Sequence, residues 1–267
     1  KNKYLKYKLK YLKMINQKGG MNNVFHLPYV PTAFAISSHV LSQPVEAAPS
    51  TGLSEEEKQE IINYFKESLY MTHIDRLLNN DESVKRWVFD FTYEHVGFVA
   101  PAIKHIARML QYNTTLKKLK LEWGVDENTA EHLAYALKKN TTLMLLDLKV
   151  NRIKDAGAKA LANALNHNDT LQTLWLDQNN IGAAGAKDLA EMLQHNATLQ
   201  ELGLFDNSIG ADGAKDFADM LQDNATLQVL GLDRNNIGNA GAKHLAEMLQ
   251  HNATLQELDL SSNKIGD

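Results

Sequence analysis

The apolar positions of the chain recur with a period of 28 residues over 168–251. The three copies are NDTLQTLWLDQNNIGAAGAKDLAEMLQH, NATLQELGLFDNSIGADGAKDFADMLQD and NATLQVLGLDRNNIGNAGAKHLAEMLQH, which start at Asn168, Asn196 and Asn224. A period between about 20 and 50 residues is typical of solenoid proteins, in which each repeat packs only on its neighbours. The pattern therefore predicts one elongated repeat domain.

Each copy contains two shorter periodicities. In 198–204, TLQELGL, the leucines at 202 and 204 alternate with other residues, as in a strand with one buried face. The segment that follows has apolar residues at the i, i+3, i+4 and i+7 positions of a helix, which in the first copy are Ala186, Leu189, Ala190 and Leu193. Each copy therefore predicts one strand and one helix that bury their apolar faces by stacking on other copies.

Two columns of asparagine mark the ends of these elements. The first column follows each helix, and we expect it to end the helix in the left-handed conformation that Asn tolerates: Asn168, Asn196, Asn224 and Asn252. The second column comes three residues after the last strand leucine: Asn151, Asn179, Asn207, Asn235 and Asn263. We expect the side-chain amides of this second column to bond to turn backbone inside the coil.

The combined pattern LxxLxLxxNxI, then GxxGAxxLAxxL, resembles the leucine-rich repeats of the ribonuclease-inhibitor type. Similar repeats occur in intracellular NOD-like receptors and in Ran GTPase-activating proteins. The resemblance covers residues 113–267 and implies an α/β, right-handed leucine-rich-repeat solenoid, or horseshoe, with parallel strands on the concave face and helices on the convex face. It does not imply one function, because this fold serves many.

Composition divides the chain around this domain. The expected segments are a lysine-rich N-terminal tail, a flexible linker, a helical N-terminal cap with a degenerate first repeat, and the leucine-rich repeats with an incomplete last one, at 1–20, 21–53, 54–112 and 113–267. The tail has seven lysines and no acid, and the linker holds four of the five prolines. A solvated tail is the favoured interpretation, and weak contact with a membrane or nucleic acid is the alternative.

The outer repeats depart from the pattern. In 83–89, SVKRWVF, the residues Val84, Trp87 and Phe89 take the places of the strand leucines, which predicts the degenerate first repeat. The cap before it starts with Ser54 and Glu57, which together form a capping box. At the other end, the strand leucines of the last repeat are expected to lie at an open edge, through which the chain could self-associate.

The sequence offers little chemistry for catalysis. It contains no cysteine and none of the phosphate-binding, nucleophile-elbow or zinc-protease motifs, so we expect no enzyme, no cofactor and no metal site. No apolar run is long enough to span a membrane, and no signal peptide is recognisable. An intracellular, cytoplasmic protein is expected.

The variable positions of the repeat indicate a binding surface. Residues that flank the strand leucines point outward on the concave face, and their middle row is Lys120, Asp147, Trp175, Gly203, Gly231 and Asp259. An aromatic wall beside a shallow slot with an acidic rim is predicted there, formed by the partner-binding residues Trp175, Phe205, Gly203, Gly231, Asp177, Asp206, Asp233, Arg234 and Val229. In the alternative interpretation, Trp175 only covers the backbone of the glycines.

These features favour a non-enzymatic scaffold that binds another protein on the concave face. Residues 168–267 contain fifteen Asp or Glu and five Lys or Arg, which would attract a basic protein surface and repel nucleic acid. Two alternatives stay open. One is a regulator of a small GTPase, similar to the Ran GTPase-activating proteins, and the other is an adaptor whose basic tail recruits it to membrane or nucleic acid.

Overall fold

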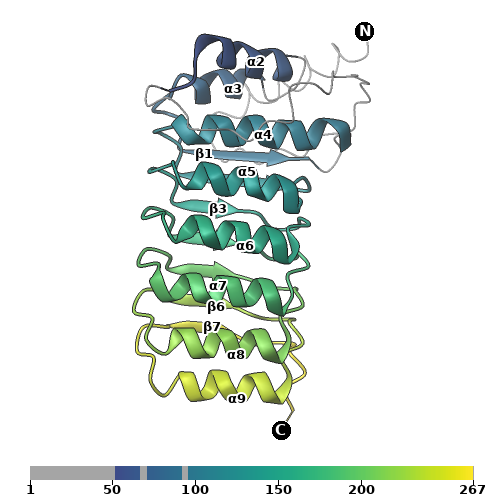
Figure 1. Cartoon of the computed structure of the whole chain (residues 1–267), viewed down its shortest axis with the longest axis vertical. Coiled ribbons are helices and arrows are strands. Elements are labelled where there is room, and N and C mark those ends of the chain that lie inside the picture. Colours follow the sequence, from purple (N-terminus) through teal and green to yellow (C-terminus); the bar gives the residue numbers. More distant parts are fainter. Residues whose placement is uncertain (1–51, 67–70, 92–95, 267) are drawn as a thin grey trace, which may run out of the picture.

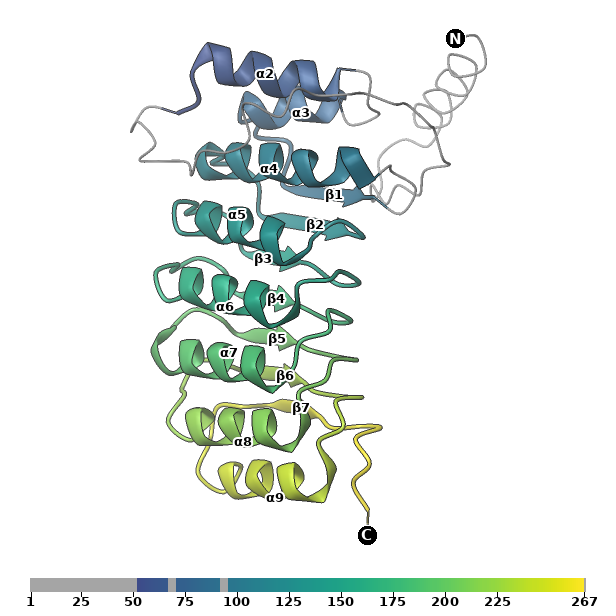
Figure 2. The same ribbon diagram turned by 45° about the vertical axis from the view of Figure 1, so that its right-hand side comes forward.

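The structure is a computed structural model, and it describes residues 52–66, 71–91 and 96–266. The tail predicted at 1–20 and nearly all of the linker predicted at 21–53 lie outside this range. Within it, two helices, α2 and α3, come first, and strands and helices then alternate from β1 to β7 along one stack (Figure 1). Turned by 45°, the stack separates into a layer of helices and a layer of strands, as Figure 2 shows. The predicted α/β leucine-rich-repeat solenoid is confirmed.

Seven strands form a single parallel sheet in the order of the sequence. Their bounds are β1 Arg86–Asp90, β2 Lys118–Glu122, β3 Leu145–Asp147, β4 Thr173–Trp175, β5 Glu201–Gly203, β6 Val229–Gly231 and β7 Glu257–Asp259. The first pairing sets Trp87 beside Leu119 and Phe89 beside Leu121. This register sets Trp87 and Phe89 at the positions of the strand leucines of the next repeat.

Helices cover one side of the sheet. Their bounds are α2 Glu55–Phe65, α3 Met71–Leu78, α4 Val96–Tyr112, α5 Glu127–Leu137, α6 Lys154–Leu165, α7 Ala183–His195, α8 Gly210–Leu221 and α9 Gly238–Met248. From α6 to α9, each helix approaches the preceding helix closely at a glycine near its start. A Cβ added at Gly213 would lie 2.8 Å from the Cβ of Ala186 on the preceding helix, which explains why the period carries glycine there.

The core lies between the two layers. Leu202 and Leu204 of one repeat and Leu148 of another are fully buried, as are Leu189 and Phe217 on the helices. Inward and outward residues alternate along β2 and along β4–β6, and the inward leucines were predicted correctly. Among the described residues, no helix is long and apolar enough to cross a bilayer.

The second asparagine column acts as predicted. Asn207, for example, donates from Nδ2 to the carbonyl of Leu176 at 3.0 Å and accepts from the backbone N–H of Ile181 at 2.9 Å. Asn179 and Asn235 make equivalent bonds to Leu148 and Leu204. These side chains satisfy turn backbone that would otherwise be buried without a partner, and they join each repeat to the one before it.

The prediction for the first asparagine column was wrong. None of its members has a positive φ, and Asn196 is extended with φ −77° and ψ 122°. Instead, its Oδ1 accepts from the backbone N–H groups of Thr198 and Leu199, and its Nδ2 donates to the carbonyl of Leu165 in the preceding repeat. The column therefore holds the turn before each strand through its side chain rather than through a left-handed backbone.

The N-terminal cap rests on the first repeat. The capping box of Ser54 and Glu57 is present at the start of α2. Arg108 on α4 holds α2 in place through ion pairs of 3.0 Å to both Glu57 and Glu60. At the other end, Leu258 is half-buried and Ile265 is 43% exposed. Self-association through that edge stays a prediction.

Candidate protein-binding surface

The outward residues of the strands form the rows that the sequence predicted. Parallel pairing aligns Lys120, Asp147, Trp175, Gly203, Gly231 and Asp259 in the middle row. The preceding row is Lys118, Leu145, Thr173, Glu201, Val229 and Glu257. Neighbouring members of a row are about 4.8 Å apart across the sheet, so their side chains meet.

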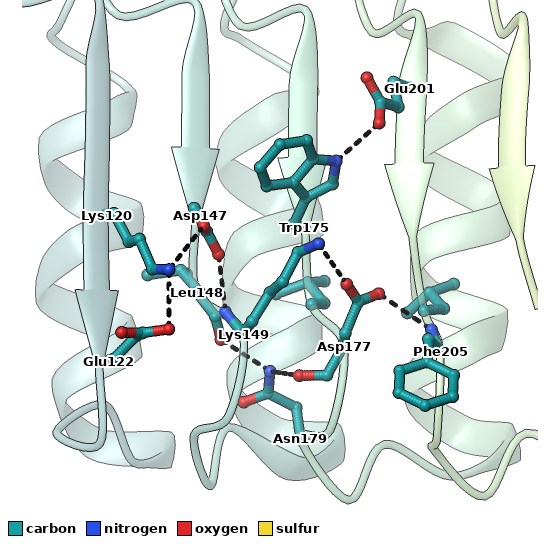
Figure 3. A network of polar contacts seen from close by, with 12 residues as sticks. Lys120, Glu122, Asp147, Leu148, Lys149, Trp175, Asp177, Asn179, Glu201 and Phe205 are labelled. Carbon is teal, nitrogen blue, oxygen red and sulfur yellow. Dashed lines mark hydrogen bonds and ion pairs between the residues drawn. The ribbon is translucent and has the colours of Figure 1, made fainter. Parts of the chain in front are cut away.

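Charged side chains on β2–β4 neutralise one another. The ammonium of Lys120 lies 2.8 Å from Glu122 and 3.7 Å from Asp147. Burial alone would lower the pKa of Lys120, but its hydrogen bond to Glu122 and the charge of Asp147 raise that pKa above the usual value. Lys149 forms the next ion pair, at 2.8 Å to Asp177. Figure 3 shows these contacts running across neighbouring strands.

Trp175 is held from two sides. The ammonium of Lys149 lies 4.0 Å from the centroid of its ring, which is within the range of a cation–π interaction. Its indole N–H donates to Oε1 of Glu201 at 2.7 Å (Figure 3). The side chain is half-buried, so part of the ring stays exposed to solvent in a fixed orientation.

Asp177 does not belong to the acidic rim, which corrects one of the predicted site residues. It is 8% exposed, and one carboxylate oxygen accepts from the backbone N–H of Phe205 at 3.0 Å while the other pairs with Lys149. The carboxylate therefore links β4 to the segment after β5 rather than facing a partner. The repeat pattern alone could not reveal that Asp177 is buried, because Asp233 occupies the equivalent position two repeats later and is half-buried among other acids.

The two glycines of the middle row are not equivalent. A Cβ at Gly203 would lie 2.8 Å from Oδ1 of Asp177 and 3.0 Å from Cδ1 of Trp175, so these side chains cover it. Trp175 thus covers the backbone of Gly203. A Cβ at Gly231 would meet only backbone, at 3.8 and 4.0 Å. The open space beside the aromatic wall therefore lies over Gly231.

Acidic groups surround this space. Glu257 and Asp259 on β7 are exposed, and Asp233 follows β6. Burial raises the pKa of Asp233 above its usual value, and repulsion from Asp259 and Asp177 adds to the shift. The pKa of Asp259 is lowered, because Ser261 donates hydrogen bonds to its carboxylate. Strands β5, β6 and β7 contain no lysine or arginine.

Three of the remaining predicted residues follow the strands at one edge of this surface, and Val229 lies at the start of β6. Phe205 is half-buried, and the guanidinium carbon of Arg234 lies 5.3 Å from the centroid of its ring. Asp206 is exposed and accepts from Nε2 of Gln178 at 3.1 Å. Asp206 and Arg234 have φ values of 53° and 54°, so both occupy a left-handed turn position. Val229 is half-buried beside Glu201 and Glu257 in the preceding row.

The sequence interpretation missed several residues that shape the surface. Lys149 and Glu201 hold Trp175, and Glu257 and Asp259 add acidity. Trp123 was missed too: it is 56% exposed at φ 63°, on the same edge as Asp206. The described residues contain no group of three or more His, Cys, Asp or Glu that could hold a metal ion.

The fold and the repeat define the class: a leucine-rich-repeat protein of the ribonuclease-inhibitor type. Residues 195–218, 223–246 and 251–267 match the pattern described as "Leucine Rich repeat". Residues 70–205 match the "TMOD/LMOD Leucine-rich domain". The chain belongs to this TMOD/LMOD leucine-rich domain family.

One solved structure agrees with this assignment. The structure described as "Leiomodin-1 Actin-Binding Site 2 (ABS2)" is 26% identical, covers 59% of this chain and 90% of its own, and has a TM-score of 0.52. A tropomodulin C-terminal domain from Caenorhabditis elegans is 14% identical, covers 62% of this chain and 92% of its own, and has a TM-score of 0.47. No curated protein matches the chain. The chain is thus similar to protein-binding leucine-rich-repeat scaffolds.

Proposed function

We propose that this chain is a scaffold that binds a basic segment of a protein partner on the concave face of β4–β7. The observation that carries the proposal is the contrast between the charges of the two halves of the sheet. Lys120 on β2 and Lys149 just after β3 each form an ion pair with an acid. Strands β5–β7 contain no lysine or arginine, and Arg234, just after β6, lies against the ring of Phe205. The excess negative charge there favours a partner that supplies the missing cations.

The aromatic residues give the same surface an apolar anchor. Lys149 and Glu201 hold the side chain of Trp175 in place before a partner binds. Binding would therefore cost little further conformational entropy of this side chain. The open backbone at Gly231 leaves room next to it for a side chain of the partner. A partly exposed, fixed tryptophan beside free space is typical of residues that contribute most to binding energy.

We propose actin as the partner to test first. This choice rests on the family of the chain and on the description of the similar structure, which names an actin-binding site of leiomodin-1. The regulator of a small GTPase, by contrast, gains no support from any contact on the surface.

The test is a titration of purified actin, both monomeric and filamentous, with the full chain and with Trp175→Ala and Phe205→Ala. Each variant should weaken binding by about 2 kcal/mol, or roughly thirtyfold, as the loss of an aromatic anchor does. Lys187→Ala on the helix side provides the control, because Lys187 is 62% exposed there and should leave the affinity unchanged.

Equal affinity for all variants would place the actin site elsewhere and overturn the proposed surface. If neither form of actin binds, a photo-reactive residue at Val229 should still cross-link to a basic protein, and one at Lys187 should not. Faster GTP hydrolysis by a small GTPase in the presence of the chain would favour the regulator instead.

A further inference from the structure

The acidic sheet face has a complementary segment in its own chain. Residues 1–20 contain seven lysines and no acid, whereas 168–267 contain fifteen acids and five bases. Four acids lie on β5–β7 or just after β6: Glu201, Asp233, Glu257 and Asp259. These three strands contain no lysine or arginine. A neighbouring cation is Arg234, which lies against Phe205.

We propose that residues 1–20 bind the acidic sheet face of β5–β7 within the same molecule and compete there with the protein partner. This inference rests on the proposed function of that face, and it adds a built-in inhibitor of the site. The lysines would approach Asp233, Glu257 and Asp259, and the partner would have to displace them.

The chain is long enough for this contact. Residues 21–51 separate the basic segment from the first described residue, and a stretch of that length spans at most about 105 Å when fully extended. The sheet from β1 to β7 has six steps of about 4.8 Å, or roughly 29 Å. The segment can therefore reach any strand of the face from the N-terminal end of the stack.

Covalent attachment makes even a weak contact effective. A segment tethered within reach of its site has an effective concentration of about millimolar, so an intrinsic dissociation constant near that value already gives substantial occupancy. The composition of the segment also matches the surface. Tyr4, Tyr7 and Tyr11 alternate with the lysines, and they could contact Trp175 and Val229, which are half-buried.

The absence of cysteine from the chain makes a direct distance measurement simple, since two introduced cysteines are the only sites that a thiol-reactive spin label can modify. One label is placed in the basic segment with Asn16→Cys. The second is placed at the sheet face with Ser261→Cys, which is exposed, or on the helix side with Lys187→Cys. Pulsed electron resonance then gives the distribution of distances between the labels in the full chain.

We expect a short, narrow distance distribution for the 16–261 pair and a longer one for the 16–187 pair. Raising the ionic strength from about 0.05 M to about 1 M should broaden the 16–261 distribution, because screening weakens contacts between exposed charges. The triple variant Asp233→Asn, Glu257→Gln, Asp259→Asn should broaden it as well. The matched control is Glu191→Gln, Asp219→Asn, Glu247→Gln, which removes the same charge from α7, α8 and α9 and should change nothing.

A distribution for the 16–261 pair that is broad at low salt and equal in both triple variants would overturn the inference. So would a short distance seen only when two singly labelled chains are mixed, since the occupant would then be a second copy. Loss of the short distance on adding anionic lipid vesicles, without any effect of the face variants, would assign the segment to a membrane and also overturn it.

A second readout separates this inference from the proposed function. Replacing Lys6, Lys8, Lys10 and Lys13 by glutamine should strengthen actin binding about threefold to tenfold, because the fraction of chains with a free face rises accordingly. If actin binding depends on Trp175 but does not change with the lysines, the proposed function stands and the inhibitory contact fails. If the labels show the contact but no variant of the face alters actin binding, the contact stands and the proposed function fails.

Discussion

Strands β2–β4 and β5–β7 have the same backbone arrangement, but their outward side chains make different contacts. At β2 and β3, Lys120 forms ion pairs with Glu122 and Asp147, and just after β3, Lys149 connects Asp177 to the ring of Trp175. On β5–β7 the middle row holds two glycines and Asp259, and the acids have no lysine or arginine in the same strands. The repeat frame therefore fixes where side chains point, and the residue at each position decides whether that part of the sheet is closed or open.

The comparison teaches that one row position can have opposite roles. Asp177 and Asp233 lie two repeats apart in the same row. Asp177 is buried against a backbone N–H and a lysine, and Asp233 is half-buried among other acids. The former contributes to the structure of the sheet, and the latter is available to a partner.

The largest expected effect comes from removing buried leucines, and it should be the same in both halves of the sheet. Leu148→Ala and Leu204→Ala each remove a fully buried side chain, and each should lower the free energy of unfolding by about 2–5 kcal/mol. Phe205→Ala, next to Leu204 but outward, should cost less than about 1 kcal/mol. Urea denaturation measures all three, and a Phe205→Ala loss as large as that of Leu204→Ala would mean that the outward assignment is wrong.

The next effect concerns the shared row. Asp177→Ala leaves the backbone N–H of Phe205 without its acceptor, which should cost about 1–3 kcal/mol of stability. Asp233→Ala should not lower stability, because its removal relieves repulsion with Asp259. Thermal melts of the two variants compare the halves directly, and equal destabilisation would remove the distinction between closed and open strands.

The two glycines sharpen the comparison further. Gly203→Ala forces Asp177 and Trp175 to shift, so it should cost about 1 kcal/mol or more of stability and alter the tryptophan fluorescence. Gly231→Ala fits without such contacts and should leave stability nearly unchanged while filling the space that a partner would use. If both variants melt alike, the space assigned to Gly231 is not there.

The smallest expected effect is a change in the pKa of Asp233. The pKa of Asp233 is raised by burial and by its acidic neighbours, so the folded state binds a proton more strongly than the unfolded state. This carboxyl should therefore favour folding at pH values below its unfolded pKa and lose that contribution as the pH rises through its folded pKa. NMR titration should show the Asp233 pKa fall in Asp259→Asn, and an unchanged value would contradict the proposed repulsion.

Much of this architecture could be predicted from the sequence because the repeat encodes it. The rows of outward residues, the buried leucines and the second asparagine column follow from a fixed period and a fixed side-chain alternation. The backbone conformation of the first asparagine column could not be predicted in this way. Asparagine after a helix is compatible both with a left-handed backbone and with side-chain hydrogen bonds to the next turn, and the sequence does not distinguish them.

The parts of the site that were missed depend on side-chain conformation rather than on register. Lys149 is long enough to pair with Asp177 or to extend into solvent, and only the structure shows that it lies over Trp175. The burial of Asp177 follows from that choice. Trp123 could not be identified from the repeat, because the aligned positions hold Val150, Gln178, Asp206 and Arg234 and none of these is aromatic.

The central claim is that the acids of β5–β7 belong to the binding surface proposed on β4–β7, and an actin titration with the two charge-matched triple variants tests it most directly. The account predicts that Asp233→Asn, Glu257→Gln, Asp259→Asn weakens binding at least about tenfold and reduces its salt dependence. Glu191→Gln, Asp219→Asn, Glu247→Gln should retain the affinity of the unmodified chain. Equal affinities for the two triples, whether both weakened or both unchanged, would contradict the claim.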